Sequence, residues 1–283
     1  MYSRWNPFAL TVLMLFTAVP LAAGIGYAFL YSFGVIGALN KGFITDHWKR
    51  LFDEGAVWKS FGYSAIIAAV TVLTSVAVAM WVALRKYNNL KKGWLSYFIY
   101  LPLSFPAMVA GFFAFQALSG AGLLSRIFYK IGITSSIESF PSLINDYWGI
   151  GILLAQCFLC LPFFLLLYVN RIQTERIPEY LDLAGTLGAS RSKAMWKIAA
   201  PILWQKTTPN ILIYFIFIFG SYEIPVLLGR SNPEMVSVLA VRKLQKFNLY
   251  DIPQGYAVAL IYTAFVLLII ALIFKKRRLA NDL

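Results

Sequence analysis

The hydrophobic positions of the chain fall into six long runs, separated by polar intervals. The runs cover about residues 8–32, 60–84, 94–118, 149–170, 209–229 and 255–274. A helix needs about 20 apolar residues to cross a bilayer, and each run meets that length. The first run is also too long for the core of a signal peptide, so we expect it to stay in the protein. The pattern predicts an all-α integral membrane protein, with residues 1–283 forming a single transmembrane domain.

Composition supports this class. Hydrophobic residues make up 60% of the chain and charged residues 13%, whereas a soluble domain carries about 25% charged residues. The net charge of +13 comes from Lys and Arg at the ends of the apolar runs. This placement is typical of residues that orient a membrane protein, and we therefore expect no nucleic-acid partner.

Basic residues also predict the orientation. If the N-terminus is cytoplasmic, 15 of the 25 Lys and Arg residues lie on the cytoplasmic side, including the clusters RKYNNLKK and KKRR at span ends. Residues near span ends carry the most weight in the positive-inside rule. We therefore expect both termini, and the interval between the fourth and fifth runs, to be cytoplasmic.

That interval, residues 174–206, is polar, but it contains residues that typically begin and end helices. Pro178 suits the first turn of a helix, and Gly188 suits a helix end. A second helix is predicted to begin after Ser190, which can cap it, and to end at Pro201. The interval is thus expected to be a helix, a glycine turn and a helix.

Small residues are concentrated around this turn, where they allow another backbone to approach closely. They are Ala184, Gly185, Gly188, Ala189 and Ser190. A short helix with an apolar stripe, an acidic residue and a small-residue flank can dock in a groove of a partner protein. The alternative from the pattern alone is an ordinary amphipathic helix between two spans.

The residues Asp182-Leu183-Ala184, then Gly188, then Ile198 and Pro201 resemble the EAA motif of the permease subunits of binding-protein-dependent ABC importers. The motif reads E-A-A, three residues, G, nine residues, I-x-L-P, and both gaps match. The chain departs from it with Asp182 for Glu, Leu183 for Ala and Ala200 for Leu. A shorter carboxylate at Asp182 weakens any salt bridge made from this position.

The resemblance extends over nearly the whole chain. Within this family, the chain looks most similar to permeases of the spermidine and putrescine type. It implies the MetI-like type I importer fold with two permease subunits, here expected to be a heterodimer. It also implies two cytoplasmic ATPase subunits, an extracytoplasmic binding protein and a place in the bacterial inner membrane. The ATPase-docking residues implied by the motif and its surroundings are Glu179, Tyr180, Asp182, Leu183, Ala184, Gly185, Gly188, Ala189, Ser190, Ile198 and Pro201.

This chain is expected to be a transport subunit without catalytic residues of its own. It has no GxxxxGK[ST] phosphate loop, so ATP–Mg is expected on the partner ATPase. No metal or cofactor is expected either, because His47 has no ligand partner nearby in the sequence. Cys157 and Cys160 lie inside an apolar run, where packed thiols are expected rather than a redox pair.

Glu223 is the one acidic residue expected well inside a span, and an ionisable residue at that depth usually faces a cavity or a partner. It is therefore a candidate for the solute pathway, with Tyr222 and Gln116 as further candidates. The alternative is a packing role, paired with Arg230. We expect a polyamine as solute; aminophosphonate, thiamine or ferric iron is the alternative group.

Charged residues in the expected outer loops could dock the binding protein. They include Lys49 and Arg50 in the first loop and Arg242, Lys243 and Lys246 in the third. Three other classes fit the sequence less well. A membrane enzyme needs a nucleophile–base pair or a metal cluster, and a stand-alone secondary transporter usually has several buried ionisable residues. A purely structural subunit would not need a docking element.

Overall fold

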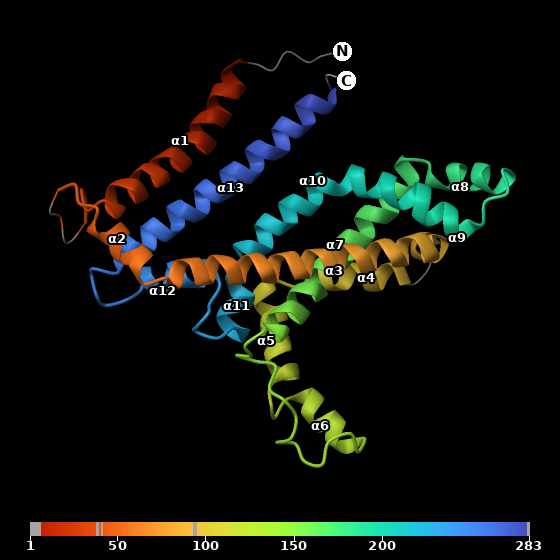
Figure 1. The fold of residues 1–283 in the computed structure, drawn as a ribbon, viewed down its shortest axis with the longest axis horizontal. Coiled ribbons are helices and arrows are strands. Elements are labelled where there is room, and N and C mark those ends of the chain that lie inside the picture. Colours follow the sequence, from red (N-terminus) through yellow and green to blue (C-terminus); the bar gives the residue numbers. More distant parts are fainter. Residues whose placement is uncertain (1–6, 38–39, 41, 93–94, 282–283) are drawn as a thin grey trace. The chain divides into compact units, whose positions relative to one another are not determined.

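The computed structural model describes residues 7–37, 40, 42–92 and 95–281, which form helices and no β-strand (Figure 1). In this part of the chain, six helical stretches are long and apolar enough to cross a membrane. They are Thr11–Ser32, Ala56–Tyr87, Ala107–Lys130, Ile150–Thr174, Arg191–Phe219 and Ile252–Leu272. The predicted all-α membrane class with six spans is therefore confirmed. Arg4, used for the orientation, lies outside the described residues.

The chain divides into two compact units. One is Met1–Ser60 with Val236–Leu283, and the other is Phe61–Met235. The helix α3 (Ala56–Lys92) begins in the first unit and continues in the second, with a non-helical residue at Lys86. Each unit has its own buried side chains and is described by itself.

In the first unit, α1 (Pro7–Ser32) and α13 (Ile252–Asn281) lie side by side (Figure 1). The short helices α2 (Asp46–Asp53) and α12 (Val236–Leu244) contact α13 at one end. The Tyr256 ring of α13 lies 4.6 Å from the Tyr31 ring of α1, so aromatic contacts join these two helices.

The second unit is organised around α7 (Ile150–Thr174), which contacts α4, α5, α8, α10 and α11. Its side chains Phe164 and Tyr168 are completely buried. The other elements of this unit are α4 (Leu95–Leu103), α5 (Ala107–Leu118), α6 (Leu123–Lys130), α8 (Ile177–Thr186), α9 (Arg191–Ala194), a π-helical turn (Met195–Ala199), α10 (Ala200–Phe219) and α11 (Glu223–Leu228).

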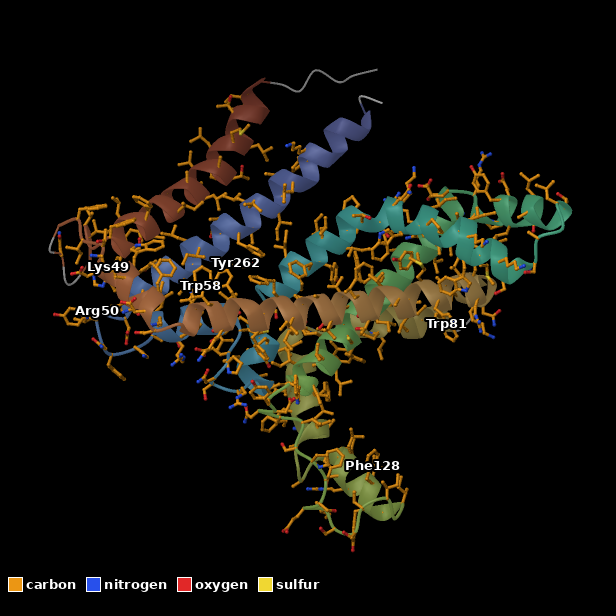
Figure 2. All side chains as sticks on the ribbon, in the orientation of Figure 1. Lys49, Arg50, Trp58, Trp81, Phe128 and Tyr262 are labelled. Carbon is orange, nitrogen blue, oxygen red and sulfur yellow. The ribbon has the colours of Figure 1, made fainter. Side chains whose placement is uncertain are left out.

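The run expected as one span over residues 94–118 is divided into α4 and α5, because Pro106 cannot donate a backbone hydrogen bond in a continuous helix. A short helix, α6, follows α5, and its Phe128 packs edge-on against Phe140 (Figure 2 labels Phe128).

The run expected as one span over residues 209–229 is also interrupted. The helix α10 ends at Phe219, and α11 begins at Glu223. Two residues explain the break: Gly220 lowers the stability of a continuous helix, and Pro225 has no N–H to donate to the carbonyl of Ser221. Glu223 thus lies at the start of a separate helix, where the sequence predicted a continuous span.

Candidate functional site

The polar interval forms the turn expected around Gly188. The Gly188 N–H donates to the Gly185 carbonyl at 3.0 Å, and the Ala189 N–H donates to the Ala184 carbonyl at 2.9 Å. These two bonds make a Schellman motif, which closes the C-terminus of α8. Gly188 has a φ of +84°, a left-handed conformation that glycine adopts without strain.

The second helix differs from the prediction in its length and its cap. Ser190 stands at the N-terminus of α9, but its side chain makes no capping hydrogen bond. The helix also continues through Pro201, because α9, the π-helical turn and α10 follow one another directly up to Phe219. Pro201 falls in the first turn of α10, immediately after the π-helical turn. There the hydrogen-bond register already changes, so a proline is tolerated.

The helix α8 has two apolar faces. Ile177 and Ala184 are buried against the rest of the unit, with exposed fractions of 1% and 7%. Tyr180, Leu183 and Leu187 point outward and are 49%, 60% and 81% exposed. Residues spaced three and four apart share one helix face, so these three make a continuous exposed apolar stripe. We call them the outer stripe of α8.

The other expected docking residues surround this stripe. The positions of Gly185 and Gly188 face open space, since an added Cβ would have nothing within 4 Å. Glu179 is exposed and lies 3.9 Å from Arg176, too loose to matter for stability. Four of the remaining positions are exposed: Asp182, Ala189, Ser190 and Pro201. Ile198 is half-buried in the π-helical turn.

Three contacts join the two long helices that hold this segment. Lys206 of α10 lies 3.4 Å from Glu175, the residue that ends α7. Deeper in the unit, the Thr207 hydroxyl donates to the Tyr168 hydroxyl at 3.5 Å, and the Tyr214 and Phe163 rings stack at 4.2 Å. Because these contacts lie at successive levels, α7 and α10 form one packed pair.

The candidate pathway residues come from two neighbouring helices. Gln116 is exposed on α5, while Tyr222 and the exposed Glu223 stand at the start of α11. The structure brings α5 and α11 into contact. A Cβ added at Gly111 would lie 2.9 Å from Leu227 Cδ1 and 3.7 Å from the backbone of Ile224, both in α11. The Arg230 guanidinium lies over the Tyr147 ring at 5.1 Å, and no ion pair between Arg230 and Glu223 is seen among the described residues.

One polar pair was missed by the sequence reasoning. The Gln156 side chain of α7 is 4% exposed, and its amide donates to the Ser221 hydroxyl at 2.7 Å. Ser221 lies in the break between α10 and α11, so this bond fixes the break to α7. A lone glutamine within the apolar run GILLAQCFLC was the available signal, since polar residues at membrane depth are rarely without a role.

Of the Lys and Arg side chains expected in the outer loops, some are exposed and one is buried. Lys49 and Arg50 project from α2 and are exposed (Figure 2). Lys243, in contrast, is 3% exposed, and its Nζ donates to Glu54 Oε2 at 2.8 Å and to Gln254 Oε1 at 2.5 Å. It therefore holds the first unit together and is not available for a binding protein.

Comparison with known proteins agrees with this architecture. A profile of the family described as binding-protein-dependent transport system inner membrane component matches residues 75–276, more than half of the chain. The sulfate transport system permease protein CysT of Escherichia coli (strain K12) is 25% identical over 231 residues, covering 80% of this chain and 78% of that protein. The molybdenum transport system permease protein ModB of Azotobacter vinelandii is 21% identical over 227 residues, covering 80% and 95%.

A solved structure supports the fold. The crystal structure of a bacterial ABC transporter involved in the import of the acidic polysaccharide alginate superposes with a TM-score of 0.67 at 15% identity, covering 93% of this chain and 92% of that one. At this identity the likeness shows the fold of an importer permease. The chain therefore belongs to the family of inner-membrane components of binding-protein-dependent transport systems, as a multi-pass transport subunit whose ATPase is a separate chain.

Proposed function

We propose that α8 and the turn at Gly188 dock the ATPase subunit, and that the chain forms one half of the translocation pathway. The outer stripe of α8 is the observation that carries this proposal. Tyr180, Leu183 and Leu187 are all about half exposed or more, on a segment expected outside the bilayer. An apolar stripe in water favours a protein partner that covers it, and a helix seated in a groove is a common way to do so.

Family membership implies an ATPase and a solute-binding protein as partners. Open space at Gly185 and Gly188 supports a close approach of the ATPase to the α8 backbone. ATP–Mg would be bound by that ATPase. Closure of the ATPase dimer would move α8, and the packed pair of α7 and α10 would carry this movement to the break at residues 220–222. Such a two-state movement of packed helices is a common switching device.

The second permease subunit is proposed to be a different chain, and both termini are proposed to be cytoplasmic. A membrane-impermeant thiol reagent applied to intact cells tests the orientation. We expect Phe247→Cys to be labelled from outside, because this side chain is fully exposed on the loop after α12. We expect Leu187→Cys to be labelled only after the membrane is opened.

A small oxyanion is the solute that the relatives favour, since their names are those of sulfate and molybdenum permeases. These names give no support to the polyamine expected from the sequence. The polyamine remains a second candidate for one reason: Glu223 is exposed at the helix break, where a carboxylate would attract a cation and repel a dianion.

Uptake into right-side-out vesicles that contain the complete transporter and are loaded with ATP separates these candidates. We expect ATP-dependent uptake of labelled sulfate or molybdate that unlabelled spermidine does not reduce. Uptake of spermidine, with no effect of sulfate, would exclude the oxyanion assignment and leave the permease assignment standing. Uptake that needs no ATPase subunit would exclude the importer mechanism itself.

A further inference from the structure

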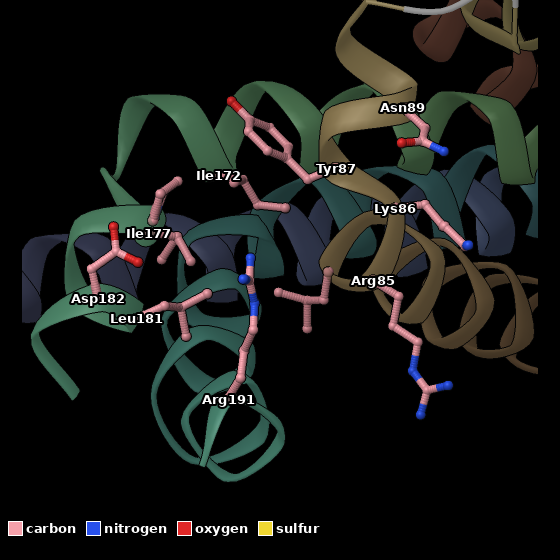
Figure 3. A pocket seen from close by; sticks show the side chains of 11 residues that line it. Arg85, Lys86, Tyr87, Asn89, Ile172, Ile177, Leu181, Asp182 and Arg191 are labelled. Atoms are coloured by element: carbon pink, nitrogen blue, oxygen red, sulfur yellow. The ribbon is translucent and has the colours of Figure 1, made fainter. Parts of the chain in front are cut away.

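A pocket of about 330 Å³ lies beside α8 (Figure 3). It is formed by the end of α3, the end of α7, the start of α8 and the first residue of α9. Its lining residues are Leu84, Arg85, Lys86, Tyr87, Asn89, Ile172, Ile177, Pro178, Leu181, Asp182 and Arg191. Of the expected docking residues only Asp182 lines this pocket, and none of the three residues of the outer stripe does.

The lining combines an apolar wall with a basic rim. Ile172 and Ile177 are almost fully buried, at 3% and 1% exposed, and they form the wall with the neighbouring leucines. Three cations and one carboxylate, Asp182, surround it, which leaves two positive charges in excess. Figure 3 shows the Arg191 side chain directed from α9 into the middle of the pocket.

The cations have no carboxylate partner within the described part of the chain. Ion pairs there join other residues, such as Arg176 with Glu179 and Lys206 with Glu175. Arg85 instead lies over the ring of Trp81, one turn earlier on α3, at 4.9 Å; Figure 2 marks this tryptophan. Tryptophan next to Lys and Arg at the end of a span is typical of the headgroup level of a bilayer, and from this we infer that the pocket opens at that level.

We propose that this pocket binds the phosphodiester headgroup of an anionic phospholipid, such as phosphatidylglycerol. Basic pockets between membrane helices on the cytoplasmic side bind anionic headgroups, and the apolar wall can pack against the acyl chains of a lipid, which a bare anion lacks. The lipid would join α3 to α8 and α9, so that the bilayer helps to position the docking segment. The cytoplasmic placement rests on the proposed function.

Native mass spectrometry of the complete transporter, taken from nanodiscs with and without phosphatidylglycerol, tests this site. We expect the wild type to retain phosphatidylglycerol, and Arg191→Gln and Lys86→Gln each to lower the retained fraction about tenfold, the loss expected for one charge-assisted hydrogen bond. Lys193→Gln is the matched control: Lys193 lies two residues from Arg191 and is exposed, but it does not line the pocket. It should retain lipid like the wild type.

Three results would overturn the proposal. Equal lipid retention in the wild type and both variants would mean that the pocket holds no lipid. Displacement of the lipid by inorganic phosphate at low concentration would mean a site for a free anion. Loss of the ATPase subunit from Arg191→Gln with unchanged lipid would assign the pocket to the ATPase interface. Uptake by the wild-type complex is measured in parallel, so a failed transport assay counts against the proposed function and not against the lipid site.

Discussion

Replacement of Gly188 tests whether transport needs the backbone turn between α8 and α9, independently of the side-chain contacts that α8 makes with a partner. At a φ of +84°, an ordinary L-residue costs about 1–2 kcal/mol, and a β-branched residue is a clear outlier. Nothing in the chain lies within 4 Å of the position of an added Cβ, so the cost of Gly188→Val is backbone strain and not a clash. We expect this variant to insert normally, to lose the Schellman turn and to lose transport.

Gly188→Asn is the matched control, because asparagine tolerates the left-handed conformation. It should retain the turn and most of the transport activity. Gly185→Leu tests the partner contact alone: Gly185 is inside α8 and also faces open space, and leucine favours a helix by about 0.8 kcal/mol over glycine. This variant should be at least as stable as the wild type but lose the co-purifying ATPase.

The assay is ATP-dependent uptake in vesicles, normalised to the amount of inserted permease, with the ATPase subunit quantified after purification. Normal uptake by Gly188→Val would refute the role of the turn. A Gly185→Leu variant that keeps the ATPase and transports normally would refute a close approach of the partner to α8.

Two further substitutions test the polar contacts inside each unit. Gln156→Leu removes the 2.7 Å hydrogen bond to Ser221; we expect a loss of about 1 kcal/mol in stability and a larger fall in uptake, measured by thermal unfolding and vesicle transport. If the Gln156→Leu variant is less stable than the wild type but has the same uptake, the hydrogen bond is only structural. Lys243→Met leaves the buried Gln254 without its 2.5 Å contact and should cost about 1–3 kcal/mol in thermal unfolding. The surface variant Lys246→Met should cost less than about 1 kcal/mol, and equal losses in the two variants would contradict this account.

Much of the fold was predictable because it depends on patterns that span many residues. The six apolar runs and the glycine turn of the docking segment are both present. Run length and the conformational freedom of glycine are properties that the sequence carries directly.

The rest depends on contacts that hydrophobicity alone does not encode. The run 209–229 is mostly apolar and long enough for one span, so the break at residues 220–222 was indicated only by Gly220, Pro225 and the polar residues between them. Pro201 was read as a helix end because the π-helical turn before it has no sequence signature. The bond from Gln156 to Ser221 joins positions 65 residues apart, and one sequence offers no means to pair them. The solute was inferred from an overall likeness and from Glu223, and the relatives do not support it.

Cross-linking from the outer stripe of α8 tests the central claim most directly. Leu183 is 60% exposed, and a Leu183→Cys variant should cross-link to the ATPase subunit in native membranes. Phe247→Cys, fully exposed on the loop after α12, should not. The native Cys160 is buried and Cys157 lies half-buried in α7, so the added thiol dominates the reaction. Cross-linking of the ATPase to Phe247→Cys and not to Leu183→Cys would contradict the account.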